Sequence, residues 1–162
     1  MNEDQNVEAQ PYPDDTVSGA GSGAAANEDW FLAELVSWAN TFGFQAGITL
    51  HVGGTIVSGT MISGAAYFAL FRSSLSVALS GSPPEIMTPI DDMLSTYGSI
   101  YDKPEVITHP GHYIHLRDAY FFDPAGNALP RGGALWRGKL SAIDGFSLGS
   151  LSTRGGDELQ PQ

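Results

Sequence analysis

One short motif in the sequence has the spacing of a catalytic serine. Residues Gly145-Phe146-Ser147-Leu148-Gly149 match the G-x-S-x-G pattern of a nucleophile elbow. That chemistry requires a strand–turn–helix around the serine and a histidine later in the chain. No histidine follows Ser147, and the flanking glycines favour a strand here. A small hydrolase using Ser147 is therefore an alternative hypothesis, not the main one.

Three histidines, His109, His112 and His115, are spaced three residues apart. Histidine clusters bind zinc, which makes a metal-binding enzyme the other form of the enzyme hypothesis. On a strand, however, His112 and His115 would point to opposite faces, because side chains alternate. A response to pH near the unperturbed pKa of about 6.5 is the more natural role for such histidines. We therefore predict no catalytic residue, no metal site and no cofactor, and expect a protein that is not an enzyme.

A basic and aromatic cluster, formed by Arg131, Trp136, Arg137 and Lys139, contrasts with an otherwise acidic chain. The chain has 18 acidic and 7 basic residues, which give a net charge of −11. Like charges elsewhere oppose association, so an attractive patch is expected where the sign reverses. Arginine and tryptophan are also enriched in interfaces. We predict a partner or self-association surface here; the alternative is that Trp136 lies in the core and the bases face solvent.

The charge distribution bears on partners and location. Residues 1–29 hold seven acidic residues and no basic one. An acidic chain with scattered arginines repels phosphate backbones, so nucleic acid is not expected as a partner. The first ten residues lack the basic and apolar regions of a signal peptide, and there is no cysteine. The uncharged stretch between Glu34 and Arg72 is interrupted by polar residues, which favours a hairpin over a membrane span. We expect a cytoplasmic protein that binds no membrane.

Composition divides the chain into a tail, one folded domain and a frayed end. Residues 1–27 are acidic, contain a Gly-Ser-Ala stretch and have almost no large apolar side chains, so they are predicted to be a disordered tail. Residues 28–152 form the predicted single domain. Residues 153–162 are polar and are predicted to fray.

The first half of the domain is predicted to be a helix followed by a bent hairpin. Phe31, Leu35, Trp38 and Phe42 recur at helical spacing, which predicts a helix over 28–42 with Asn27 as N-cap, these residues inward and Gly43 at its end. The period then changes to two. Over 44–63 it predicts a hairpin that turns at Gly53-Gly54 and bends at Gly59.

The second half is predicted to be a helical insertion followed by strands. The insertion, 64–111, holds a helix from Ala65 to Leu79, a short helix from Pro89 to Tyr97 and a loop. The strands, 112–151, run from His112 to Phe122, from Ala134 to Ile143 and from Phe146 to Leu151, the last two joined by a hairpin turn at Asp144-Gly145. The fold class is therefore α+β. The layout predicted is an N-terminal helix, then a small, strongly bent antiparallel sheet or barrel like that of Sm-like proteins, which leaves an Sm-like RNA-binding module as a second alternative.

Three segments resemble one known family. They are Gly47 to Ser63, Tyr113 to Arg117, and Trp136 to Gly149. With the helix that ends at Phe42-Gly43-Phe44, they look like the gas vesicle accessory protein U family. The resemblance covers most of residues 30–151 but not Leu79 to Thr108. Its most specific part runs from Trp136-Arg137-Gly138-Lys139 through Asp144-Gly145-Phe146.

The resemblance implies a role that composition alone does not indicate. It implies an accessory protein that assists the assembly, maturation or clustering of gas vesicles in the cytoplasm, with no catalytic residues. Shell proteins and other accessory proteins would then be the partners. We further expect a homo-oligomer, because several weak sites on one oligomer would bring vesicles together by avidity.

Overall fold

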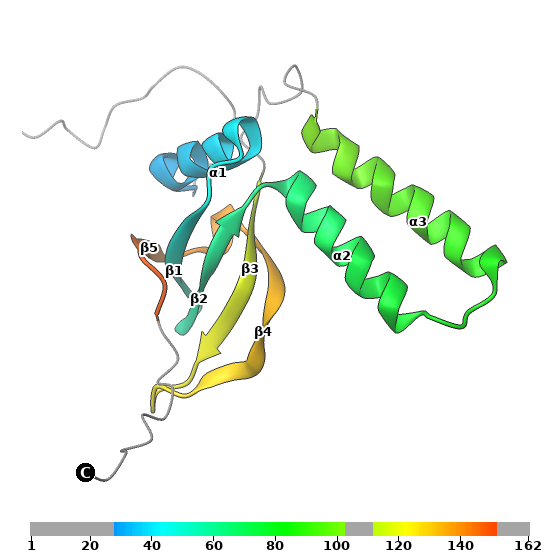
Figure 1. Cartoon of the computed structure of the whole chain (residues 1–162). Coiled ribbons are helices and arrows are strands. Elements are labelled where there is room, and N and C mark those ends of the chain that lie inside the picture. Colours follow the sequence, from blue (N-terminus) through cyan, green and yellow to red (C-terminus); the bar gives the residue numbers. More distant parts are fainter. Residues whose placement is uncertain (1–27, 103–111, 152–162) are drawn as a thin grey trace, which may run out of the picture.

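The computed structural model describes residues 28–102 and 112–151 (Figure 1). The predicted tail, the predicted frayed end and His109 lie outside the described residues. The elements, in chain order, are α1 (Trp30–Phe42), β1 (Ala46–Val52), β2 (Thr55–Ile62), α2 (Gly64–Ala78), α3 (Pro84–Ser99), the 3₁₀ helix η1 (Ile100–Asp102), β3 (Tyr113–Phe122), β4 (Ala128–Lys139), the 3₁₀ helix η3 (Leu140–Ala142) and β5 (Gly145–Leu148). Over these described residues the fold is α+β, with three α-helices and a five-stranded antiparallel sheet.

The sheet has the strand order β4-β3-β2-β1-β5. The predicted hairpin at Asp144-Gly145 is wrong, because β5 pairs with β1 at the opposite edge from β4. The helix η3 carries the chain from one edge toward the other. Asp144 then bonds to the β1–β2 turn: its backbone N–H donates to the His51 carbonyl over 2.8 Å, and its carboxylate accepts from the Gly53 N–H over 2.7 Å. The sheet is not closed into a barrel, since β4 and β5 do not pair.

A bulge bends the sheet next to Gly59. Ser58 pairs with Tyr120 and Thr60 with Arg117, so two residues of β3 face the single residue Gly59 of β2. The extra residue is Asp118, whose φ of 50° is a left-handed conformation. A Cβ on Gly59 would lie 2.9 Å from the Arg117 carbonyl oxygen. Glycine is therefore required here because the bulged strand approaches closely, not because of its own φ.

A second irregularity lengthens β4. Ala119 pairs with Ala134 but Phe121 pairs with Leu129, so residues 130–133 of β4 face a single position of β3. The strand consequently begins at Ala128 rather than at the predicted Ala134, and it ends at Lys139 rather than at Ile143.

Helix α1 packs on the sheet through its smaller side chains. Asp29, not the predicted Asn27, caps the helix: its carboxylate accepts hydrogen bonds from the backbone N–H groups of Phe31 and Leu32. The core joins the buried residues Leu32, Ala33, Leu35, Val36 and Ala39 of the helix with Ile48, Leu50, Val57, Met61, Ile114, Leu116, Ala119 and Leu140. Of the four residues predicted to face inward, Leu35 alone is buried. The other three are aromatic and lie along the rim of the helix, because compact side chains let the helix axis approach the sheet.

Helices α2 and α3 form an antiparallel hairpin that projects away from the sheet (Figure 1). An ion pair between Arg72 and Asp91 links the two helices. The predicted short helix from Pro89 is wrong at both ends, since α3 begins at Pro84 and continues to Ser99 with Pro89 inside it. Proline is well tolerated at the first position of a helix, so Pro84 starts this helix instead of ending the previous one. None of the described helices is long and apolar enough to cross a membrane.

Candidate contact surface on β4 and the helical hairpin

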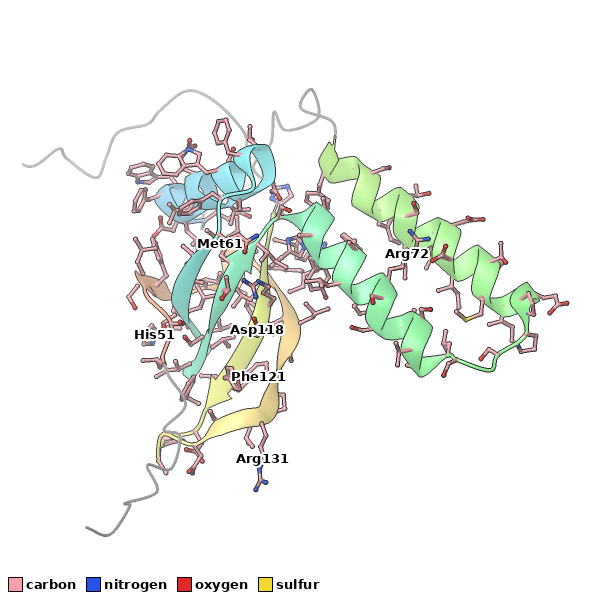
Figure 2. All side chains as sticks on the ribbon, viewed as in Figure 1. His51, Met61, Arg72, Asp118, Phe121 and Arg131 are labelled. Atoms are coloured by element: carbon pink, nitrogen blue, oxygen red, sulfur yellow. The ribbon has the colours of Figure 1, made fainter. Side chains whose placement is uncertain are left out.

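The four residues predicted to form one surface do not lie on one face. Trp136 packs against the core, and strand alternation turns Arg137 and Lys139 toward the opposite face. Arg131 lies within the β4 irregularity, at the end of the sheet away from the point where the hairpin joins it (Figure 2). The structure therefore brings Arg137 and Lys139 together and separates them from Arg131 and Trp136.

Arg137 is held by two ring systems of β3. Its guanidinium carbon lies 3.3 Å from the centroid of the Tyr113 ring, and its Nε donates to Nε2 of His115 over 3.3 Å. The register explains both contacts, because Arg137 pairs with His115, and Lys139 pairs with Tyr113. Cation–π contact of this kind fixes an arginine while leaving its outer N–H groups available.

The cations of β4 differ from the other described cations in having no acidic partner. Arg72 pairs with Asp91, and Arg117 lies 2.8 Å from the Asp118 carboxylate. Within the described residues, no carboxylate comes within salt-bridge distance of the three cations of β4, which are Arg131, Arg137 and Lys139. Among the residues that the structure describes, β4 is thus where positive charge lacks an acidic partner, in a chain of net charge −11.

His115 lies at the point where the hairpin meets the sheet. Its side chain is buried, and its ring centroid is 4.7 Å from that of Tyr67 in α2 and 5.6 Å from that of Tyr101 in η1. Burial, followed by the nearby charge of Arg137, lowers the pKa of His115 to about 4. The hairpin is therefore docked on a neutral imidazole surrounded by aromatic rings.

An open pocket of about 370 Å³ lies beside this junction. It is lined by Tyr67, Phe68, Phe71, Tyr97, Ile100, Tyr101 and Arg137. Aromatic walls with a single guanidinium suit an aromatic ring that carries or adjoins a negative charge. Of these lining residues, sequence reasoning identified Arg137 alone as a site residue.

The hairpin leaves many apolar side chains in solvent. Those with about two-fifths or more of their surface exposed are Leu70, Phe71, Val77, Ile86, Met93 and Tyr97, and Ile100 of η1 is equally exposed. Gly64, Tyr67 and Leu94 are the buried residues of α2 and α3. Apolar surface of this extent on a projecting element is typical of a contact surface.

A second exposed apolar surface follows the rim of α1. It consists of Trp30, Phe31, Trp38, Phe42 and Phe44, which are between 36% and 77% exposed. The ring of Phe31 lies 6.0 Å from that of Phe146 in β5, centroid to centroid. Sequence reasoning placed three of these aromatics in the core, and their number on one short helix was the signal that not all could be buried.

The residues of the enzyme hypotheses are not brought together. Ser147 is exposed in β5, where it pairs with Thr49 in a strand and not in a strand–turn–helix. His112 lies 3.2 Å from the Glu28 carboxylate, whereas His115 is buried under the hairpin. Over residues 28–102 and 112–151, no three His, Cys, Asp or Glu side chains lie close enough to hold a metal ion.

A family model described as "Gas vesicle protein GvpU-like" matches residues 29–151. The chain belongs to the GvpU-like family. The match begins at Asp29, which caps α1, and ends just after β5. The region from Leu79 to Thr108 lies within the GvpU-like range, although the sequence resemblance left it out. No curated protein and no solved structure matches the chain significantly.

Proposed function

We propose that the protein is a non-catalytic gas vesicle accessory protein. It would assist the assembly, maturation or clustering of gas vesicles in the cytoplasm, through contacts with shell or accessory proteins and with copies of itself. Membership of the GvpU-like family supports the link to gas vesicles. The Sm-like character of the bent sheet stays a prediction.

The observation that carries the contact role is the meeting of two features on one side of the sheet. Arg137 and Lys139 have no acidic partner among the described residues, and they adjoin a hairpin with exposed apolar side chains. Apolar residues supply most of the affinity in an interface, whereas complementary charge fixes orientation and excludes wrong partners. A partner with an acidic rim around an apolar patch would fit this surface.

Charge substitution at two exposed positions tests the proposal. Lys139→Glu reverses a cation of β4, and Val77→Glu places a carboxylate on the exposed apolar side of α2, where Val77 is 73% exposed. Thr88→Glu is the control, because it introduces the same charge at an exposed polar position of the hairpin, on the side of α3 away from Ile86 and Met93. Arg137 is not the first choice for this test, since its contacts with Tyr113 and His115 are also structural.

The measurements are binding of the purified protein to isolated gas vesicles by flotation, and vesicle clustering in cells by electron microscopy. We expect both vesicle binding and clustering to be weakened in Lys139→Glu and Val77→Glu but not in Thr88→Glu, with circular dichroism spectra unchanged. Normal flotation and clustering by both folded variants would exclude this surface. Failure of the parent protein to bind vesicles or any vesicle protein would contradict the proposed function.

A further inference from the structure

The pocket at the base of the hairpin combines aromatic walls with a cation that has no acidic partner among the described residues. Tyr67, Phe71 and Tyr97 line it together with Arg137. Lys139 is two residues further along the same strand, on the same face. The chemistry that fits is an aromatic ring followed closely by carboxylates.

The N-terminal segment of this chain joins the domain beside that cationic end of β4. Glu28 is the first described residue, and its carboxylate lies 3.2 Å from Nδ1 of His112. His112 directly precedes Tyr113, which pairs with Lys139 and stacks on Arg137. Helix α1, which Glu28 precedes, packs on the face of the sheet opposite to Arg137, and β4 is the edge strand between the two faces. A segment tethered at Glu28 is therefore close to the pocket's cation but must pass around β4 to reach it.

The sequence of that segment carries the matching chemistry. Residues 1–27 contain five acidic residues, no basic residue and a single aromatic residue, Tyr12. Asp14 and Asp15 follow it closely. Pro11 and Pro13 restrict the backbone on either side of Tyr12, which lowers the entropy lost when such a segment is ordered.

We propose that the segment Tyr12-Pro13-Asp14-Asp15 occupies this pocket in its own chain. Tyr12 fills the aromatic pocket, and the two aspartates pair with Arg137 and Lys139. Residues 16–27 separate Asp15 from Glu28 and span about 40 Å when extended, more than a short return path needs. A tethered segment experiences an effective concentration in the millimolar range, which favours its own pocket over that of a second copy.

Docking of this segment would mask the cations of the contact surface. A partner that uses Arg137 must first displace the docked segment. The segment is therefore an intramolecular competitor that lowers the apparent affinity for such a partner. The inference adds regulation to the surface proposed above. It needs no gas vesicle for its test, so its failure would leave the proposed function standing.

Paramagnetic relaxation enhancement tests the inference on the full chain. The sequence has no cysteine, so Ser18→Cys provides a single attachment point for a nitroxide label. In ¹⁵N-labelled protein we expect strong broadening of the backbone amides of Phe71, Tyr97 and Arg137. Tyr12→Ser should reduce this broadening several-fold without touching the folded domain. Asp14→Asn with Asp15→Asn should act in the same direction.

Matched variants separate the specific contact from general charge attraction. Glu3→Gln with Asp4→Asn makes the same change of charge away from Tyr12 and should leave the broadening intact. Lys139→Gln should reduce it, whereas Arg131→Gln, in the other half of β4, should not. Broadening that is absent, or that Tyr12→Ser does not change, overturns the proposal. A second experiment mixes ¹⁴N chains that carry the nitroxide with ¹⁵N chains that do not. If broadening appears in this mixture and not within one chain, the segment docks on a second copy and the proposal is overturned.

Discussion

The Nε of Arg137 donates a hydrogen bond to Nε2 of His115 over 3.3 Å, so this ring nitrogen carries no proton. The imidazole is then neutral, with its proton on Nδ1. Protonation would place an imidazolium against a guanidinium in a buried site. Both burial and the arginine thus oppose charging of His115, in that order of importance.

The first prediction is that stability falls as the pH drops from about 6.5 to about 4. The pKa of His115 is lowered from 6.5 in the unfolded chain to about 4 in the folded protein. Between these values the unfolded chain binds a proton that the folded protein excludes, so acid favours unfolding. The full loss from this one group is on the order of 3 kcal/mol, measured by urea unfolding at several pH values.

His115→Gln should remove most of this pH dependence, and His51→Gln, at an exposed position, should retain it. The titratable or charged groups that face His115 are Tyr67, Tyr101 and Arg137, and there is no carboxylate among them. If the free energy of unfolding depends on pH in the same way in the parent and in His115→Gln between pH 6.5 and 4, another group is responsible.

The second prediction concerns Gly59. A Cβ there would lie 2.9 Å from the Arg117 carbonyl oxygen and 3.0 Å from Cα of Ala119, both backbone atoms. Gly59→Ala should therefore lower the free energy of unfolding by about 1–3 kcal/mol, and Gly59→Val by more. Gly132→Ala is the control, because its Cβ would meet nothing within 4 Å. Equal stability of Gly59→Ala and Gly132→Ala would contradict the close approach of the bulge.

The third prediction contrasts two hydroxyls on paired strands. Thr49 is buried, and its hydroxyl donates to the Gly149 carbonyl over 2.8 Å and lies 2.9 Å from the Ser58 hydroxyl. Thr49→Val should cost about 1–3 kcal/mol because buried groups lose their partner. Ser147→Ala, on its exposed neighbour, should change stability by less than about 0.5 kcal/mol and leave vesicle binding intact. Loss of function in a folded Ser147→Ala protein would restore the hydrolase hypothesis.

The fourth prediction tests how the hairpin is seated. A Cβ on Gly64 would lie 2.4 Å from the Tyr101 ring, whereas one on Gly98 would meet Phe68 at an ordinary 3.6 Å. Gly64→Ala should displace Tyr101 and lower the melting temperature. Gly98→Ala lies inside α3 and should stabilise the protein by about 0.5–1 kcal/mol. An unchanged melting temperature for Gly64→Ala would show that Tyr101 is free to move.

Local signals in the sequence predict local structure well in this protein. Gly43 ends α1 with a φ of 67°, as a helix-terminating glycine should. The pairing of β5 could not be predicted from such local signals. Asp144-Gly145 has the composition of a hairpin turn, but it lies at the end of the segment that carries the chain from β4 to the opposite edge of the sheet. Its role depends on the Gly53 N–H, which is distant in sequence. Pairing decided by such contacts cannot be read from a dipeptide.

The arrangement around Arg137 could be foreseen only to a limited extent. The alternative stated for the basic and aromatic cluster, in which Trp136 lies toward the core and the bases face solvent, matches the positions of Trp136 and Arg137. The aromatic surroundings of Arg137 could not be predicted. Tyr67 and Tyr101 belong to the helical insertion, and its hydrophobic periodicity does not indicate where it packs on the sheet. The face of α1 was misjudged because hydrophobicity alone does not distinguish a large aromatic at the rim from a compact residue at the centre.

The points where the chain leaves and rejoins the sheet are neighbours: Ile62 near the end of β2 pairs with His115 near the start of β3. A tight turn can close such a pair, as it does between β1 and β2. The segment between them is an insertion, and its described part meets the sheet at the aromatic rings around His115. Its length and surface can change over generations without altering strand pairing. The surface used for recognition can therefore change without changing the sheet, and we expect sequence differences among relatives to concentrate in this insertion.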